Sequence, residues 1–150
     1  MKGLHGKCAI VTGGATMIGE AVAADLIQHG ARVVIADINA EDGRRIAAAL
    51  GPAASFQTTD ITDDSQVAAC VAAAVERFGG VDCLVNCACS YVDNGALSSR
   101  AEWLQSYNVN VVGAAMMLQA CRPEMIKRGG GAVVNFSSIS AAAAQAGRWL

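Results

Sequence analysis

Aromatic side chains and charged side chains are both scarce in this sequence. Phe, Trp and Tyr make up 5% of the 150 residues and charged residues 16%, whereas hydrophobic residues make up 53%. Disordered chains have the opposite balance, so the composition excludes intrinsic disorder. The length is that of about one ordinary domain and is sufficient to bury a core.

An excess of positive charge is also lacking. The net charge is −2, and Lys and Arg form no cluster along the chain. Proteins that bind nucleic acids or anionic membrane surfaces carry basic patches. We therefore expect no nucleic acid and no membrane as partner, and a small molecule instead.

Long uninterrupted apolar runs are missing as well. The two longest uncharged windows, 103–121 and 129–147, are broken by Asn, Gln and Ser, which excludes a transmembrane helix. The N-terminus has only a short apolar run at 8–11 and no signal-peptide core. These absences predict a cytoplasmic protein.

The cysteines form no Cys-x-x-Cys pair, the spacing that is typical of zinc and redox sites. Several of them fall inside apolar runs, so we interpret them as small, reduced core residues and expect no metal. Three of them alternate as side chains on one strand face do, which also favours buried filling over metal ligands. The six are Cys8, Cys70, Cys83, Cys87, Cys89 and Cys121.

Short apolar runs rich in Val and Ile alternate with helical patterns. The runs lie at 8–11, 31–36, 81–85 and 132–136, with a weaker one at 53–57, and they are typical of strands buried on both faces. Between them, the spacing of Val67, Cys70, Val71, Ala74 and Phe78 predicts one buried helix face.

Capping residues agree with this alternation. Asn39 is expected to cap a helix that ends at Gly51, Thr62 to cap a helix that ends at Gly79, and Ser99 to open a capping box at the start of a long helix over about 99–127. The sequence therefore predicts an α/β protein with a Rossmann-type, doubly wound parallel sheet. We expect about five strands in the order 3-2-1-4-5, with ligands bound at the carboxyl ends of the strands.

A glycine-rich turn, Thr12-Gly13-Gly14-Ala15-Thr16-Met17-Ile18-Gly19, follows the first strand and opens a helix. Such a turn presents backbone N–H groups and the positive end of a helix dipole to a phosphate. We therefore expect Gly13, Thr16, Met17, Ile18 and Gly19 to bind a cofactor. The alternative is a tight connection that binds nothing.

Asp37 ends the second strand, about twenty residues after the glycine turn, as in the dinucleotide fingerprint. A carboxylate there accepts the ribose hydroxyls and repels a 2′-phosphate, and no Lys or Arg stands beside it. This favours NAD over NADP. The alternative is a capping or solvated aspartate.

Taken together, these motifs resemble the classical short-chain dehydrogenase/reductase family. The resemblance rests on the glycine turn, Asp60-Ile61, Asn86-Cys87-Ala88-Cys89, Val109-Asn110-Val111-Val112-Gly113 and Gly131-Ala132-Val133-Val134-Asn135-Phe136-Ser137-Ser138, which together span nearly the whole chain. It implies an oxidoreductase that transfers a hydride between nicotinamide and a secondary alcohol or ketone.

The resemblance also implies roles for single residues at the cofactor. Asp60 and the backbone of Ile61 match the positions that recognise adenine, and Asn86 and Ala88 match the Asn-Asn-Ala-Gly motif beside the adenosine ribose. From the residues alone, Asp60 could instead cap the next helix.

Two further matches concern the chemical step. Asn110 matches an asparagine that holds a water and the catalytic lysine in a proton relay, and Ser138 matches the serine that binds the substrate oxygen. The alternatives are that Asn110 satisfies a backbone kink and that Ser138 is a turn residue. A homo-oligomer, dimer or tetramer, is also implied, and the small residues around Gly113 agree with it.

The sequence departs from the family pattern at two places. Met17 replaces the second glycine of the turn, where a side chain would crowd the cofactor or require a backbone angle that only glycine adopts readily. Cys87 and Cys89 replace Asn and Gly of Asn-Asn-Ala-Gly, and the Cβ of Cys89 narrows the space beside the ribose.

The family's acid–base pair, Tyr-x-x-x-Lys, is missing from these residues, because neither Tyr91 nor Tyr107 is followed by Lys four residues later. The family spacing from Ser138 places that tyrosine just beyond Leu150. We therefore expect residues 1–150 to be the incomplete NAD-binding Rossmann domain of a longer enzyme. The alternative function is a non-catalytic dinucleotide-binding or sensor module.

Overall fold

A parallel five-stranded sheet forms the centre of the structure, a computed structural model that describes residues 3–143 and residue 146. Its order is β3-β2-β1-β4-β5, and all four neighbouring pairs are parallel, which confirms the predicted fold and strand order. The strands are β1 (Cys8–Thr12), β2 (Arg32–Asp37), β3 (Ala54–Thr58), β4 (Cys83–Asn86) and β5 (Ala132–Asn135).

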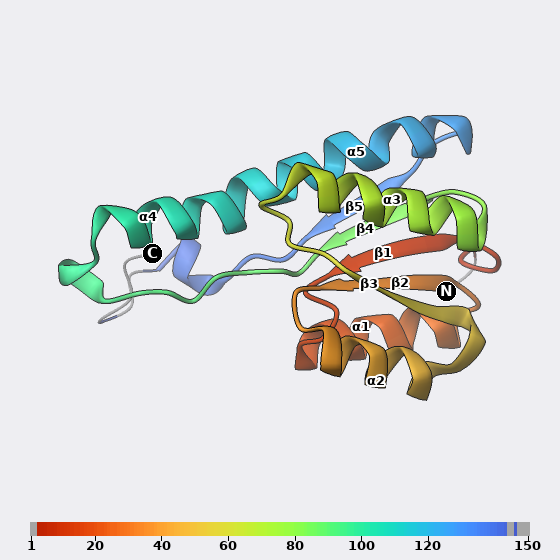
Figure 1. The fold of residues 1–150 in the computed structure, drawn as a ribbon, viewed down its shortest axis with the longest axis horizontal. Helices are drawn as coiled ribbons and strands as arrows, with labels where there is room; N and C mark the ends of the chain where they lie inside the picture. The colour runs from red at the N-terminus through yellow and green to blue at the C-terminus, as the bar shows by residue number, and fades with distance from the viewer. Residues whose placement is uncertain (1–2, 144–145, 147–150) are drawn as a thin grey trace.

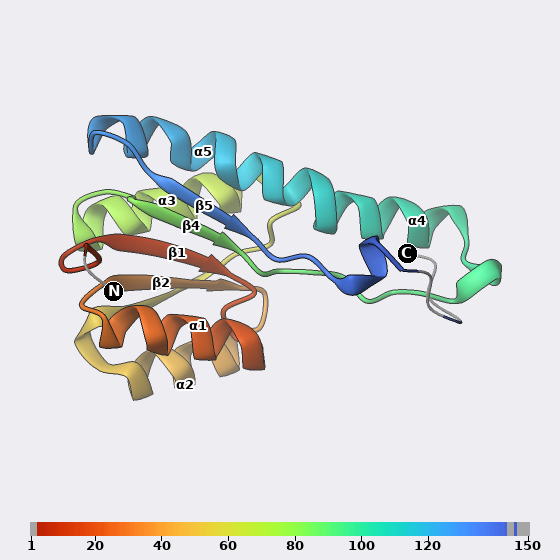
Figure 2. The ribbon, with the colours of Figure 1, turned by 180° about the vertical axis from the view of Figure 1, so that it is seen from behind.

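Helices cover both faces of this sheet (Figures 1 and 2). Helices α1 (Met17–Gln28) and α2 (Ala40–Leu50) lie on one face, and α3 (Asp64–Phe78) and α5 (Ala114–Lys127) on the other. Helix α4 (Arg100–Tyr107) continues the line of α5 beyond the sheet. Short 3₁₀ turns lie at Gly51–Ala53, Gly95–Leu97 and Ile139–Ala141. Two apolar cores result, one on each face of the sheet.

Two of the three predicted helix caps are confirmed. The Asn39 side chain accepts from the N–H of Asp42, and Ser99 forms the capping box with Glu102. The predicted cap at Thr62 is wrong. Asp63 caps α3 instead, because its carboxylate accepts the N–H groups of two first-turn residues, whereas the Thr62 hydroxyl donates to Asp60.

The predicted long helix is interrupted. A π-helical turn, Asn108–Gly113, separates α4 from α5. Gly113 ends this turn against the side chain of Ile61, and a Cβ on Gly113 would lie 2.7 Å from it. The small residue at this position therefore serves close packing inside the molecule.

Burial on both faces was predicted for every strand and is wrong for β5. All four of its residues are exposed, including Val134 at 52%. As the last strand in the order, β5 has a neighbour on one side only, and the described residues leave its faces largely open. Three apolar side chains are exposed as well on the continuous helical segment formed by α4, the π-helical turn and α5: Leu104, Val111 and Leu118.

Five of the six cysteines are buried or half-buried, in agreement with the predicted core role, whereas Cys89 is exposed. The predicted shared strand face is wrong, because β4 ends at Asn86 and leaves Cys87 and Cys89 beyond the strand. Burial raises the pKa of Cys8 to about 12 and that of Cys70 to about 11. These two thiols are therefore neutral and unreactive at physiological pH.

A buried carboxylate fastens the amino-terminal end of the sheet. Asp82 is 3% exposed, and it accepts hydrogen bonds from the Cys8 N–H, from Lys7 Nζ and from Arg128 Nη2, each at 2.9 Å. It thereby joins the start of β1, the start of β4 and the end of α5. Within the described residues, no helix is long and apolar enough to cross a membrane.

Candidate functional site

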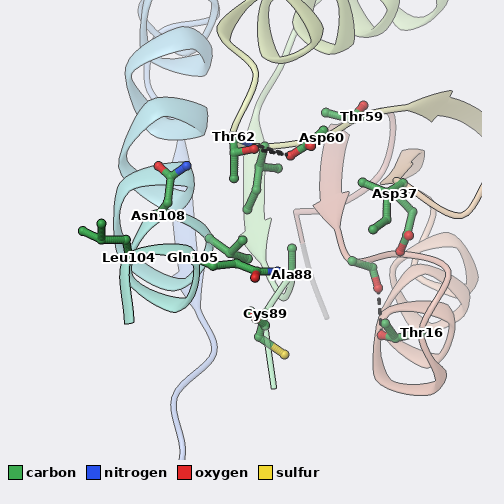
Figure 3. Close-up of a pocket in the computed structure, with 15 residues that line it drawn as sticks. Thr16, Asp37, Thr59, Asp60, Thr62, Ala88, Cys89, Leu104, Gln105 and Asn108 are labelled. Atoms are coloured by element: carbon green, nitrogen blue, oxygen red, sulfur yellow. Dashed lines mark hydrogen bonds between the residues drawn. The ribbon is translucent and has the colours of Figure 1, made fainter. Parts of the chain in front are cut away.

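A cavity of about 650 Å³ opens at the carboxyl ends of the first four strands. It brings together six of the residues predicted to bind a cofactor, which end or follow four different strands: Gly13, Thr16, Asp37, Asp60, Ile61 and Ala88. Figure 3 shows Asp60 and Thr62 along one edge of the cavity and Asp37 and Thr16 along the adjoining edge. The sheet topology produces this convergence, because parallel strands end at the same edge.

The glycine turn after β1 is tightly packed, as Gly13 and Gly19 show. Gly13 has φ +66°, and a Cβ there would lie 2.7 Å from the backbone of Ala88. A Cβ on Gly19 would lie 2.2 Å from the carbonyl oxygen of Gly13. Both positions therefore require glycine, the first for its backbone angle and its neighbour, the second for the close approach of α1 to the turn.

The N-terminus of α1 faces the cavity mouth. Thr16 caps it: its hydroxyl donates to the Gly13 carbonyl at 2.7 Å and accepts from the Gly19 N–H at 3.1 Å. The N–H groups of Met17 and Ile18 have no acceptor within the helix, as in any first turn. Free N–H groups at a helix N-terminus, together with the helix dipole, are groups that favour an anion such as a phosphate.

Met17 is the first residue of α1, and no described residue other than glycine has a positive φ. The expected backbone strain at Met17 is therefore wrong. Its side chain is 87% exposed, and it does not line the cavity. Whether the side chain crowds a cofactor stays a prediction.

Asp37 lies at the carboxyl end of β2, where both of its oxygens are held by backbone groups. Oδ2 accepts from the Ala15 N–H and Oδ1 from the Asn39 N–H, each at 2.9 Å. A carboxylate has about four lone-pair positions, so two remain for hydroxyl donors. The described lining of the cavity contains two carboxylates, Asp37 and Asp60, and no Lys or Arg.

Asp60 lies in the connection from β3 to α3 and lines the same cavity. Its Oδ1 accepts from the N–H and the hydroxyl of Thr62, at 2.9 and 2.7 Å (Figure 3). The next helix begins at Asp64 with Asp63 as its cap, so the alternative of Asp60 as the helix cap is wrong.

One wall of the cavity was not predicted from the sequence. It consists of Leu104, Gln105 and Asn108 from α4 and the π-helical turn, and Figure 3 shows Gln105 reaching toward Ala88. Their spacing places them on neighbouring positions of one helix face. That pattern marks a shared face but does not indicate which element the face approaches.

Thr12 was also missed. Its hydroxyl accepts from the N–H groups of Cys87 and Ala88, each at 3.2 Å, and thus joins the end of β1 to the segment after β4. Thr12 is fully buried, and its place at the start of the glycine-rich turn did not predict these two hydrogen bonds.

A second hollow, of about 350 Å³, adjoins the first cavity. Asn86, Asn110 and Asn135 line it, and Ala88 lines both hollows. The Asn86 Nδ2 donates to Asn135 Oδ1 at 2.9 Å and to the Ala114 carbonyl at 3.3 Å, whereas its buried Oδ1 has no partner within the described residues. The structure thus separates Asn86 and Asn110 from most of the other predicted residues.

Asn110 links the kinked helix to the segment after β4. Its Oδ1 accepts from the Ser90 N–H at 2.7 Å, and its Nδ2 donates to the Ser90 carbonyl at 3.2 Å and to the Ser106 hydroxyl at 3.1 Å. Asn110 lies inside the π-helical turn, but none of these three bonds goes to the backbone of the turn, so they do not support the alternative that Asn110 satisfies a backbone kink.

Ser138 follows β5 by three residues and is exposed. Its hydroxyl accepts from the Ser140 N–H at 3.2 Å and caps a short 3₁₀ turn. It lines neither hollow within the described chain. No cluster of three or more His, Cys, Asp or Glu side chains in that part of the chain could hold a metal ion.

Comparisons with known proteins agree with this geometry. The family model for short chain dehydrogenase matches residues 7–149. Sorbitol dehydrogenase of Cereibacter sphaeroides is 40% identical over 97% of this chain and 55% of its own length. The 3-alpha-(or 20-beta)-hydroxysteroid dehydrogenase of Mycobacterium tuberculosis is 37% identical over 91% of this chain and 53% of its own.

A solved structure is similar as well. The 3-ketoacyl-(acyl-carrier-protein) reductase of Brucella melitensis, complexed with NADH, has a TM-score of 0.91 and 32% identity, and the match covers 97% of this chain and 63% of that one. The chain spans about half the length of the curated relatives it matches. With the family model matching nearly the whole chain, the protein belongs to the short chain dehydrogenase family.

Proposed function

We propose that this chain provides the cofactor-binding half of an NAD(H)-dependent oxidoreductase that acts on a secondary alcohol or ketone. The observation that carries the proposal is the position of Asp37, which faces the large cavity while it fastens the glycine turn through the Ala15 N–H. The free lone pairs of Asp37 suit the two ribose hydroxyls of an adenosine.

The residues present fit a dinucleotide along the whole cavity. The turn around Gly13 has no room for a Cβ, and the first turn of α1 offers N–H groups to the pyrophosphate. Asp60 and Ile61 would border the adenine. When bound, the nicotinamide would supply or accept the hydride.

NAD is proposed over NADP because of charge. A 2′-phosphate beside Asp37 would meet a carboxylate, and the described lining offers no cation to offset the repulsion. At a separation of about 4 Å and an effective dielectric constant of about 20, two like charges repel by about 4 kcal/mol. The NADH complex of the similar reductase supports a nicotinamide cofactor of either kind.

For the chemical step we propose Ser138 as the residue that binds the substrate oxygen and Asn110 as part of a proton relay. Neither side chain exchanges a proton at neutral pH, so an acid–base group is required in addition. The family pattern places it in a Tyr-x-x-x-Lys motif after Ser138. Determining the gene sequence beyond the codon for Leu150 tests this, and the lack of such a motif would favour the dinucleotide sensor instead.

Titration of the chain with NADH and with NADPH, followed by nucleotide fluorescence, tests the cofactor proposal. We expect tighter binding of NADH than of NADPH. We expect Asp37→Asn to reduce the ratio of the two dissociation constants by about tenfold or more, because the substitution removes the charge but keeps the shape of the side chain. Asp42→Asn on the exposed surface of α2 is the matched control and leaves the preference unchanged. Tighter binding of NADPH by the unaltered chain would overturn the assignment.

We also propose a homo-oligomer. The exposed apolar side chains of Leu104, Val111 and Leu118 on the continuous helical segment formed by α4, the π-helical turn and α5 support it, because soluble proteins seldom leave such stripes uncovered. Light scattering after size-exclusion chromatography tests it, and a monodisperse monomer would contradict it.

A further inference from the structure

A buried hydroxyl lies next to the site and has no part in the function proposed above. Ser106 is 5% exposed, which makes it one of the few buried polar residues in the described part of the chain. It lies in α4, one helical turn before Asn110, so the two side chains meet on the same face of the helix. Its Oγ accepts from Asn110 Nδ2 at 3.1 Å.

The Asn110 carboxamide bonds to the backbone of one residue, Ser90, in a segment twenty positions earlier in the chain. It pairs with both the N–H and the carbonyl of Ser90, as a neighbouring strand would. The orientation of the carboxamide is fixed by this pairing, because a flipped amide would place its NH₂ group against the Ser90 N–H. One hydrogen of Nδ2 goes to the Ser90 carbonyl, and the other goes to Ser106.

Asn110 itself is exposed, so its side chain has water as an alternative partner. Ser90 and its neighbour Cys89 line the large cavity, and Asn110 lines the adjoining hollow. The wall between the two hollows therefore depends on an exposed side chain that would be free to rotate into solvent. Ser106 is the buried group that holds this side chain at its inner edge.

We propose that Ser106 is a positioning residue for the dinucleotide site. Its hydroxyl holds the Asn110 carboxamide against the Ser90 peptide and so fixes the segment 87–90 that forms one wall of the cavity. The link to cofactor binding rests on the proposed function, whereas the mechanical link from Ser106 to Ser90 does not. A fixed wall favours binding, because less conformational freedom is lost when the ligand enters.

Amide hydrogen exchange at residue resolution, measured by NMR on the chain, tests the mechanical link. Ser106→Ala removes the acceptor and suits a helix better than serine does, so the fold is retained. We expect exchange of the Ser90 amide to become about threefold to tenfold faster, the effect of one lost hydrogen bond, with the amides of β1 unchanged. Ser106→Thr keeps the hydroxyl and restores slow exchange.

A double-mutant cycle separates positioning from general loosening. If Ser106 acts through Asn110, then Ser106→Ala has no further effect on Ser90 exchange once Asn110→Ala is present. Ser55→Ala in β3 is the matched serine control and leaves Ser90 exchange unchanged. Equal acceleration of the β1 amides in Ser106→Ala, or an undiminished effect in the Asn110→Ala background, would overturn the proposal.

Fluorescence titration with NADH tests the link to the cofactor. We expect the dissociation constant to rise about threefold to tenfold in Ser106→Ala and to return in Ser106→Thr. If the unaltered chain binds no NADH, the proposed function fails while the exchange result still decides the role of Ser106. An unchanged dissociation constant beside faster Ser90 exchange would refute the link to binding.

Discussion

The carboxylate of Asp82 allows the sharpest stability prediction, and Asp82→Asn is the perturbation that isolates its charge. The substitution keeps the size of the side chain and leaves one oxygen to accept from the Cys8 N–H. It removes the ion pairs with Lys7 and Arg128, both at 2.9 Å. The change in stability therefore reports the loss of the charge and not the loss of side-chain volume.

The size of the effect follows from the burial of the three groups. Asp82 is 3% exposed, whereas the side chains of Lys7 and Arg128 are 42% and 34% exposed. Hydrogen bonds to buried charged groups contribute about 1.5–3 kcal/mol, and fully exposed pairs about 0–1 kcal/mol. Each pair here lies between these limits, so we expect a loss of about 2 kcal/mol in the free energy of unfolding.

The sign of the pH dependence follows from the pKa of Asp82. Burial by itself raises this pKa, but hydrogen bonds from Arg128, the Cys8 N–H and Lys7 outweigh burial and lower it. A depressed carboxyl pKa gives stability that is present above the ordinary aspartate pKa of about 3.9 and is lost as the pH falls through the folded-state value. The difference in unfolding free energy between the unaltered chain and Asp82→Asn therefore shrinks below about pH 4.

Urea unfolding, followed by circular dichroism at several pH values, measures both quantities. Asp42→Asn, which breaks the exposed pair with Arg45, is the matched control, with an expected loss below about 1 kcal/mol. Two results would refute the reasoning: a loss of unfolding free energy below about 0.5 kcal/mol for Asp82→Asn at pH 7, or a difference from the unaltered chain that grows as the pH falls.

Three further predictions concern the cavity. Gly19→Ala places a Cβ against the Gly13 carbonyl, so we expect weaker NADH binding in fluorescence titrations and a lower Tm; wild-type values for both would contradict the close packing. Cys89 is exposed in the cavity lining, so a thiol reagent counted by mass spectrometry should modify it first and NADH should slow the reaction. Met17→Gly should tighten NADH binding severalfold if the thioether crowds the cofactor, and an unchanged dissociation constant would show that it swings aside.

The sheet was predictable from the sequence because its signals are local. Buried parallel strands are recognisable as apolar runs, and the cap at Asn39 needs only residues a few positions away. The ends of the strands converge in any such sheet, so residues after different strands, such as Gly13, Asp37 and Asp60, were expected at one site. The structure places these three around one cavity.

The failed predictions depend on contacts that the sequence does not mark. Thr62 and Asp63 are both acceptable caps, and the hydrogen bond from Thr62 to Asp60 decides between them. Cys89 fits the alternation of a strand, but β4 ends before it. In both cases the local sequence allows two outcomes. A contact with residues that are close in space decides which outcome forms.

The sequence alone determined the alternation of strands and helices and the edge of the sheet at which the predicted site residues gather, because apolar periodicity and turn residues act over a few positions. Only the tertiary structure decided what closes that edge. The bonds from Asn110 join it to Ser90, twenty residues earlier, and the wall from α4 lines one cavity with residues as distant in the sequence as Gly13. Such contacts form when helices and strands pack, and no periodic pattern in the sequence encodes them.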